Sequence, residues 1–174
     1  MRGTVAHLVP VADPDEVATI IAASKRAVGA AVESLHFPLV PGVAAAIAET
    51  DSAWRALEAE HGLLDAASVS RMLGSRGRPG ALANDRRSAG KLIGVRRRHQ
   101  YLYPGFQFDG ARGRTRAAVP ALIAAADDAG LPHDELALWL CEPSGQLGGD
   151  RPVDRLDDAD AVVTALSAHV GVQW

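Results

Sequence analysis

The strongest constraint in this sequence is the way charge is distributed along the chain. Residues 1–64 hold 4 basic and 8 acidic residues, residues 65–116 hold 12 and 3, and residues 117–174 hold 2 and 10. The net charges of the three segments are therefore −4, +9 and −8. A basic segment between two acidic ones must keep its cations at the surface, and such a surface suits a polyanion. Because 16 of the 18 basic residues are Arg, a compositional bias with a merely solvated face is the alternative.

Length and composition limit the class of protein. The chain has 174 residues, of which 48% are hydrophobic and 5% aromatic, as expected for one or two small globular domains. Cys141 has no possible disulfide partner in the chain, and the dispersed histidines do not complete a zinc site. The sequence contains no apolar run of membrane-spanning length and no signal-peptide pattern. We expect a cytoplasmic protein with no cofactor, no metal and no membrane contact.

Helical signals dominate residues 1–64. Asp13 is a candidate N-cap, Pro14 suits the first helical position and Glu16 can close a capping box, so a helix is predicted from 13 to 35. Its apolar stripe suits dimerisation, and we therefore expect a homo-oligomer. A second helix is predicted from 43 to 61, with a break near 50–52 and a stop at Gly62.

The basic segment, 65–116, has the spacing of a helix-turn-helix with a wing. Asp65 is the candidate N-cap of a short helix that ends at Gly74, and a glycine-rich turn then leads to a second short helix over 81–89. Extended chain follows at 92–95 and 101–103, with basic residues between. This pattern predicts a β-hairpin with an arginine-rich tip.

Helices are predicted again in the acidic segment, 117–174. They cover 115–129, with Pro120 in the first turn, then 133–141, and a last helix that follows Asp157 and Asp158 and ends at Gly171. A glycine-rich loop over 144–152 separates the last two. The predicted fold class is thus mostly α, with domains at 1–64, 65–116 and 117–174.

Motifs for catalysis are incomplete. The segment 85–92 has Gly-Lys at the offset of a phosphate loop but lacks the leading Gly and the closing Ser or Thr. The glycines at 145–149 follow no predicted strand, which argues against a dinucleotide site. The cluster His133-Asp134-Glu135 is explained by helix capping. We expect no enzymatic activity.

Several motifs in the second half resemble a known family. They are Val-Ser-Arg-Met-Leu-Gly at 69–74, Gly-Lys-Leu-Ile at 90–93, Tyr-Pro-Gly-Phe-Gln-Phe at 103–108, Leu-Trp-Leu at 138–140, and Leu-Gly-Gly-Asp-Arg-Pro at 147–152 with Leu156. Together they resemble the antitoxins of the Xre/MbcA/ParS group over residues 65–174. The last motif is similar to the signature of their toxin-binding domain. Residues 1–64 match nothing in that group.

The resemblance implies a partner and a role. The partner would be a RES-domain toxin that consumes NAD, and the antitoxin would silence it by covering its active-site cleft. The family also implies binding to the chain's own promoter, so that duplex DNA is the second partner. The charge pattern independently assigns a polyanion to the basic segment and a protein to the acidic one.

Candidate site residues follow from both arguments. Arginines of the turn, the second short helix and the hairpin are candidates for DNA contact: Arg76, Arg78, Arg86, Arg87, Arg96, Arg97 and Arg98. Candidates for toxin contact lie in the glycine-rich loop and at the chain end: Leu147, Pro152, Leu156, Val170 and Trp174. The aromatic residues of 101–108 and Trp139 are expected in the core.

Two other functions stay open at this stage. One is a free-standing transcription regulator, similar to MerR or excisionase proteins, that uses the C-terminal domain only to dimerise. The other is an adaptor that does not bind DNA. A neighbouring gene for a RES-domain protein would favour the antitoxin hypothesis over both.

Overall fold

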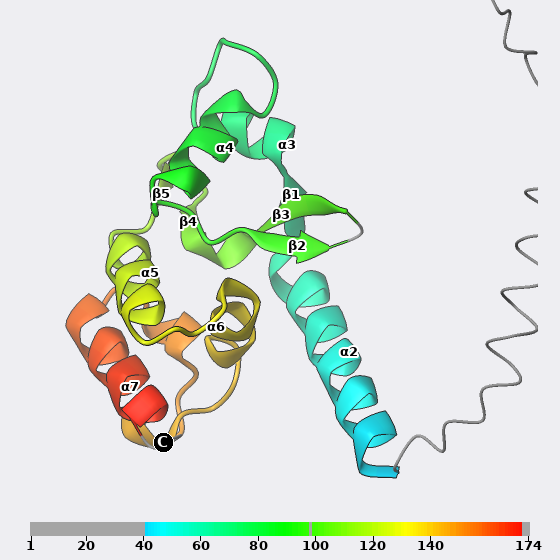
Figure 1. Ribbon diagram of the computed structural model, residues 1–174. Helices are drawn as coiled ribbons and strands as arrows, with labels where there is room; N and C mark the ends of the chain where they lie inside the picture. Colours follow the sequence, from blue (N-terminus) through cyan, green and yellow to red (C-terminus); the bar gives the residue numbers. More distant parts are fainter. Residues whose placement is uncertain (1–40, 98, 172–174) are drawn as a thin grey trace, which may run out of the picture. The chain divides into compact units, whose positions relative to one another are not determined.

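The computed structural model describes residues 41–97 and 99–171 (Figure 1). The chain divides into two compact units, Met1–Ala46 and Ile47–Trp174, and the following paragraphs concern the second. The helix and the dimerisation stripe predicted over 13–35 lie outside the described residues, as do Arg98 and Trp174. The unit from Ile47 onward contains both the basic segment and the C-terminal helices.

The described chain is mostly helical, with a small antiparallel sheet, as the sequence predicted. The α-helices are α2 (Pro41–His61), α3 (Ala66–Met72), α4 (Ala81–Ser88), α5 (Ala118–Asp128), α6 (His133–Trp139) and α7 (Ala159–Gly171). The strands are β1 (Leu63–Asp65), β2 (Val95–Arg97), β3 (Gln100–Pro104), β4 (Phe108–Asp109) and β5 (Arg114–Thr115). Short 3-10 helices are η1 (Gly105–Gln107), η2 (Gly145–Leu147) and η3 (Pro152–Arg155).

Local capping chemistry sets the helix ends in the basic segment. The Asp65 carboxylate accepts the Ser68 N–H at 2.6 Å and caps α3, and this hydrogen bond holds the pKa of Asp65 below its ordinary value. Gly62, with φ of +74°, ends α2. The break predicted near 50–52 is wrong, because α2 continues to His61. An ion pair between Arg55 and Asp51 at 2.9 Å supports the helix at that point.

The sheet contains one strand more than the predicted hairpin. β3 is the central strand, with β2 on one side and β1 on the other, and both pairings are antiparallel. The β2–β3 turn is also tighter than expected, so Arg96 and Arg97 lie on β2, opposite Tyr101 and Gln100, rather than at the tip. A second, two-stranded sheet pairs β4 with β5.

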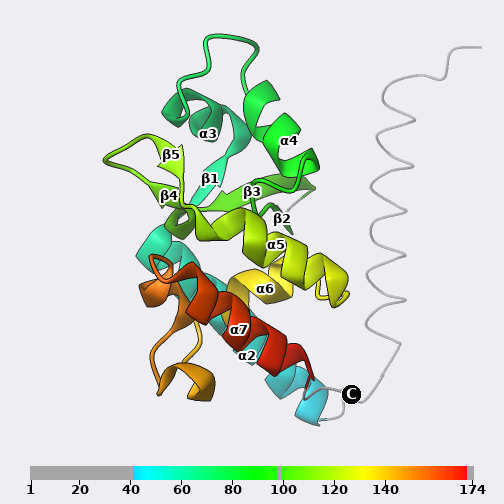
Figure 2. The ribbon, with the colours of Figure 1, turned by 90° about the vertical axis from the view of Figure 1, so that its left-hand side faces the viewer.

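One hydrophobic core joins the basic segment to the C-terminal helices. Trp54 and Leu57 of α2, together with Ile93 just before β2 and Val95 at its start, belong to the same buried cluster as the inward faces of α5, α6 and α7. Figure 2 shows α7 lying alongside α5. The basic segment and the acidic C-terminal segment therefore share one hydrophobic core.

A smaller cluster supports the two short helices. It consists of Val69, Ala83, Leu92, Tyr103 and Phe108, so it contacts α3, α4 and the strands at once. Most of the aromatic residues expected in the core are buried as predicted. The exception is Tyr101, which is 39% exposed.

Candidate nucleic-acid interface

A buried hydrogen bond fixes α4 relative to α3. Gly80, the N-cap position of α4, has φ of +80° and no side chain to offer the helix. The hydroxyl of Ser70, on α3, instead accepts the Ala83 N–H at 3.1 Å. A Cβ at Gly80 would lie 3.1 Å from the Cβ of Ala66, which shows how closely the turn approaches α3. The two helices therefore form one rigid unit.

The strands are attached to this unit by the hydrogen bonds of two further side chains. Tyr103, on β3, donates its hydroxyl hydrogen to Oδ1 of Asn84 on α4 at 3.1 Å. Gln107 accepts the Ile93 N–H at 2.9 Å and donates to the carbonyls of Ile93 and Pro104 at 2.9 and 3.0 Å. The chain that leads from α4 into β2 is thereby held in place.

Ion pairing separates the basic residues into two groups. Within the described chain, the arginines outside 65–116 all have carboxylate partners, namely Arg55, Arg151 and Arg155. Arg112 and Arg116 are also paired. The basic residues with no carboxylate partner among the described residues, called the unpaired cations below, are Arg71, Arg76, Arg78, Arg86, Arg87, Lys91, Arg96, Arg97 and Arg114.

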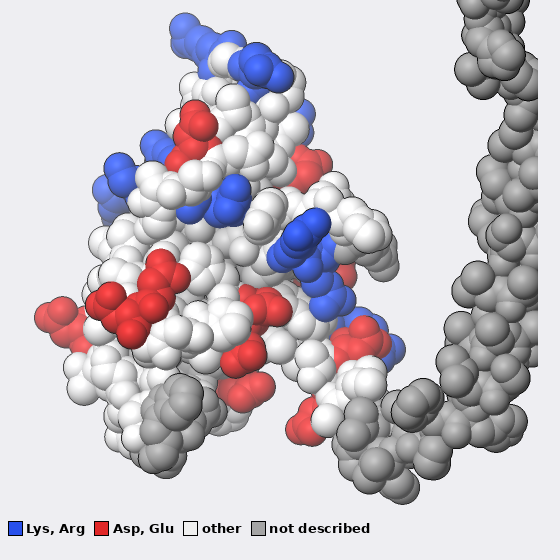
Figure 3. Space-filling model, viewed as in Figure 1, with Lys and Arg blue, Asp and Glu red and all other residues white. Residues whose placement is uncertain are grey.

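The unpaired cations lie on α3, the α3–α4 turn, α4, the segment between α4 and β2, β2 and β5. On the face drawn in Figure 3, Lys and Arg gather over α3, α4 and the hairpin, whereas Asp and Glu gather over α5 and α6. Because no internal carboxylate neutralises these cations, the positive electrostatic potential of this surface acts on an external anion.

The sequence-predicted arginines differ in their surroundings. Arg76 and Arg78 are exposed in the turn, Arg96 is exposed on β2, and Arg86 is half-buried on α4.

The two remaining described arginines stack on aromatic rings of the chain. Arg87 lies 3.9 Å from the centre of the Tyr101 ring, and Arg97 lies 4.7 Å from that of Trp54. Arg71, Lys91 and Arg114 were not among the candidates. The charge count of the segment was the signal that could have included them.

The predicted toxin-contact residues are mostly internal. Leu156 and Val170 belong to the main core, Pro152 is also buried, and Leu147 packs against the core while half-buried. These side chains shape the loop and the end of α7. A partner protein would meet their exposed neighbours.

Arg151 attaches that loop to α2. Its guanidinium donates to both carboxylate oxygens of Glu60, at 2.7 and 2.8 Å, and to Asp154 at 2.8 Å. These hydrogen bonds hold the pKa of Glu60 and that of Asp154 below their ordinary values. No pattern in the sequence predicted this contact, because Glu60 and Arg151 are far apart along the chain.

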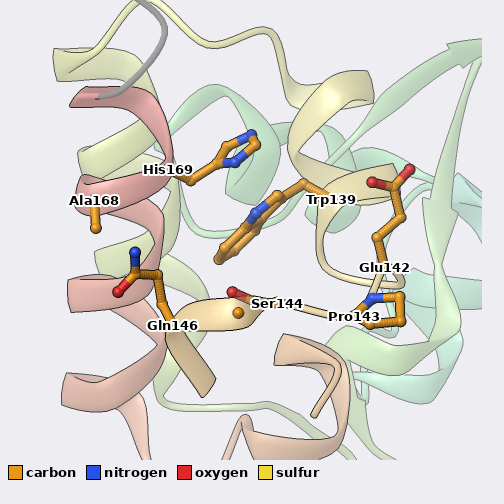
Figure 4. Close-up of a pocket in the computed structure, with 8 residues that line it drawn as sticks. Trp139, Glu142, Pro143, Ser144, Gln146, Ala168 and His169 are labelled. Carbon is orange, nitrogen blue, oxygen red and sulfur yellow. The ribbon is translucent and has the colours of Figure 1, made fainter. Parts of the chain in front are cut away.

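A hollow of about 420 Å³ lies beside Trp139 (Figure 4). Its lining includes Ser144 and Gln146 from the glycine-rich loop and His169 from the last turn of α7. The Trp139 and His169 rings lie 5.6 Å apart at 33°. The loop and the C-terminal end of α7, predicted separately as partner contacts, therefore meet at one place.

The described residues contain no group of three side chains suited to a metal ion. No helix in that same part of the chain combines the length and the apolar character needed to cross a membrane. Burial raises the pKa of the Cys141 thiol to about 11, so the thiol is a poor nucleophile.

Comparison with known proteins identifies a structural neighbour. The NMR structure of Rv2175c matches with a TM-score of 0.54 and 25% sequence identity, over 64% of this chain and 82% of that chain. Neither the protein-family models nor the curated proteins give a match. Over the matched region, the chain is similar in fold to Rv2175c.

Proposed function

We propose that this protein binds duplex DNA through α3, the α3–α4 turn, α4 and the β2–β3 hairpin, arranged as a helix-turn-helix with a wing. The observation that carries the proposal is that, in the described chain, the unpaired cations are confined to residues 71–114, and all but Lys91 and Arg114 lie on these elements. Cations that already serve carboxylates gain little from a polyanion. Those without partners can replace the counterions that condense on DNA.

The contacts that join the elements support the proposal physically. Because the Ser70 and Tyr103 hydrogen bonds fix α4 against α3 and β3, the arginines on these elements keep a constant spacing. Constant spacing lowers the conformational entropy lost when several arginines bind at once. Arg86 on α4 is the candidate for contact with base edges, and the exposed arginines of the turn and of β2 are candidates for phosphate contact.

A pair of matched variants tests this proposal. Replacing Arg76 and Arg78 with Ala should weaken binding to a duplex and lower the slope of log K against log salt by about 2. Replacing Arg55 and Arg155 with Ala changes the net charge equally, but these arginines are ion-paired and lie outside the proposed interface. The control should leave the slope unchanged. Equal losses in the two variants would show that only net charge matters.

We also propose, as a second function, that the C-terminal region neutralises a RES-domain toxin. The supporting observations are the motif resemblance and the convergence of the glycine-rich loop and the end of α7 at the hollow beside Trp139. Co-expression of the chain with such a toxin, when the neighbouring gene encodes one, provides the test. Protection of the cells, lost when Gln146 and His169 are replaced with Asp, supports the toxin function. A DNA-binding chain that never protects would be a free-standing regulator.

A further inference from the structure

A second hollow lies where α4, the start of β2, β3 and the first turn of α6 come together. It has a volume of about 260 Å³, and its lining includes Arg87, Arg96, Tyr101, His133 and Asp134. A water molecule occupies about 30 Å³ in the liquid, so the hollow has room for a polyatomic ion. It lies beside the proposed DNA-binding elements, not beside Trp139.

Arg87 is held in this hollow before any ligand arrives. One face of its guanidinium stacks on Tyr101, and its stem passes over Gly94, where a Cβ would lie 2.5 Å from Cδ of Arg87. The lack of a side chain at position 94 thus makes the path of the arginine possible. Stacking restricts the guanidinium without using its donors, which lie in the plane of the group.

Those donors are only partly used, because the hydroxyls of Tyr103 and Ser88 are the acceptors beside the Arg87 guanidinium. A guanidinium carries five N–H donors, yet the hydrogen bond that Arg87 donates to the Ser88 hydroxyl is long, at 3.4 Å. Its Nε is buried and has no hydrogen-bond partner in the described chain. An anion that enters the hollow would meet the terminal N–H groups of Arg87, which form stronger hydrogen bonds to a charged acceptor than to a hydroxyl.

The charges around the hollow favour a monoanion. Arg87 and Arg96 contribute two positive charges and Asp134 one negative charge, while His133 is directed to Asp127 at 2.9 Å. These three charged groups sum to +1. A phosphodiester carries one negative charge and offers oxygens to which two guanidinium groups can donate.

We infer that this hollow binds one phosphate group, and that in the complex with DNA it takes a single backbone phosphodiester, with Arg87 and Arg96 as donors and Tyr101 as the residue that positions Arg87. The inference rests on the proposed function for the source of the phosphate. It assigns Arg87 to the backbone, whereas its neighbour Arg86 remains available for base edges. Arg86 and Arg87 would therefore contact different parts of the DNA.

Three variants test the roles of Arg87, Tyr101 and Arg96 in a DNA titration. Arg87→Met keeps an unbranched stem over Gly94 and removes the charge, so the salt slope should fall by about 0.9. Tyr101→Ala keeps every cation, so affinity should fall about two- to fivefold with the slope unchanged. Arg96→Met, at an exposed position, should act like Arg87→Met and tests the hollow even when the first variant does not fold. Thermal unfolding of each variant provides the folding control.

Duplexes with one methylphosphonate, which is neutral, locate the contact. The wild-type protein should lose affinity at one position where Arg87→Met shows no further loss. Equal losses in both proteins at every position, or unchanged slopes in both arginine variants, would overturn the inference.

Inorganic phosphate, titrated while the Gly94 amide is followed by NMR, separates this result from failure of the proposed function. A shift that Arg87→Met abolishes supports the site even when DNA does not bind, and it then overturns only the assignment to the DNA backbone. If the Gly94 amide does not shift and no methylphosphonate position causes a specific loss of affinity, the hollow does not bind phosphate.

Discussion

The buried amide of Gln107 gives the sharpest stability prediction. Gln107 has no exposed surface, and its side chain forms three hydrogen bonds to main-chain groups. The N–H and C=O of Ile93, which is also fully buried, find their described hydrogen-bond partner in this amide. Gln107→Leu keeps a side chain of similar size and removes all three bonds. The variant therefore measures the effect of losing these hydrogen bonds while the packing of the core changes little.

The expected effect is worked from the N–H and C=O of Ile93, whose described hydrogen-bond partner is the Gln107 amide. Each buried main-chain group without a partner costs about 1–3 kcal/mol, so the free energy of unfolding should fall by about 2–6 kcal/mol. The exposed Gln146 is a matched control, and Gln146→Leu should change it by less than about 0.5 kcal/mol.

Urea unfolding, followed by circular dichroism, measures both variants. Because Ile93 leads into β2, hydrogen exchange of its amide should also become faster in Gln107→Leu. If Gln107→Leu unfolds at the same urea concentration as the wild-type protein, the buried amide does not hold the residues that lead from α4 into β2.

Three further predictions concern other parts of the fold. Gly105→Ala should abolish stable folding, measured by thermal unfolding, because a Cβ would overlap the backbone carbonyl that ends α2. Alkylation of Cys141 at about pH 8 should be about 100-fold slower in the native than in the unfolded protein, because the raised pKa, about 11, lowers the thiolate fraction. The pKa of Glu60 and that of Asp154 are lowered from 4.5 and 3.8, so the stability they add is present above about pH 4.5 and is lost as the pH falls. Arg151→Ala should make that acid loss shallower in urea unfolding at several pH values.

Local signals in the sequence predicted several helix ends, although the helix expected from 115 begins at Ala118 because Arg114 and Thr115 form β5. The Asp65 cap, the stop at Gly62 and the first-turn proline at 120 each depend on groups close in the chain, and each appears in the structure. β1 was missed because it is three residues long and its pairing with β3 is not local. The break expected in α2 was wrong because buried Trp54 and Leu57 anchor the helix through tertiary contacts.

The sequence predicted the charge of the candidate site but not the contacts that its arginines make. Counting charges identified the basic segment, yet it could not show that Arg87 and Arg97 stack on aromatic rings, because their partners are set by tertiary packing. The resemblance to a toxin-binding motif likewise named Pro152 and Leu156, which the structure buries. Apolar residues of a motif are equally suited to core and interface, and sequence does not separate the two.

The salt dependence of DNA binding by the wild-type chain tests the central claim most directly. If about five of the unpaired cations reach phosphates, a plot of log K against log salt for a duplex should have a slope between about −4 and −5. Fluorescence anisotropy of a labelled duplex over a range of salt concentrations gives that slope. A slope near zero, or no binding at low salt, would contradict the assignment of this surface to DNA.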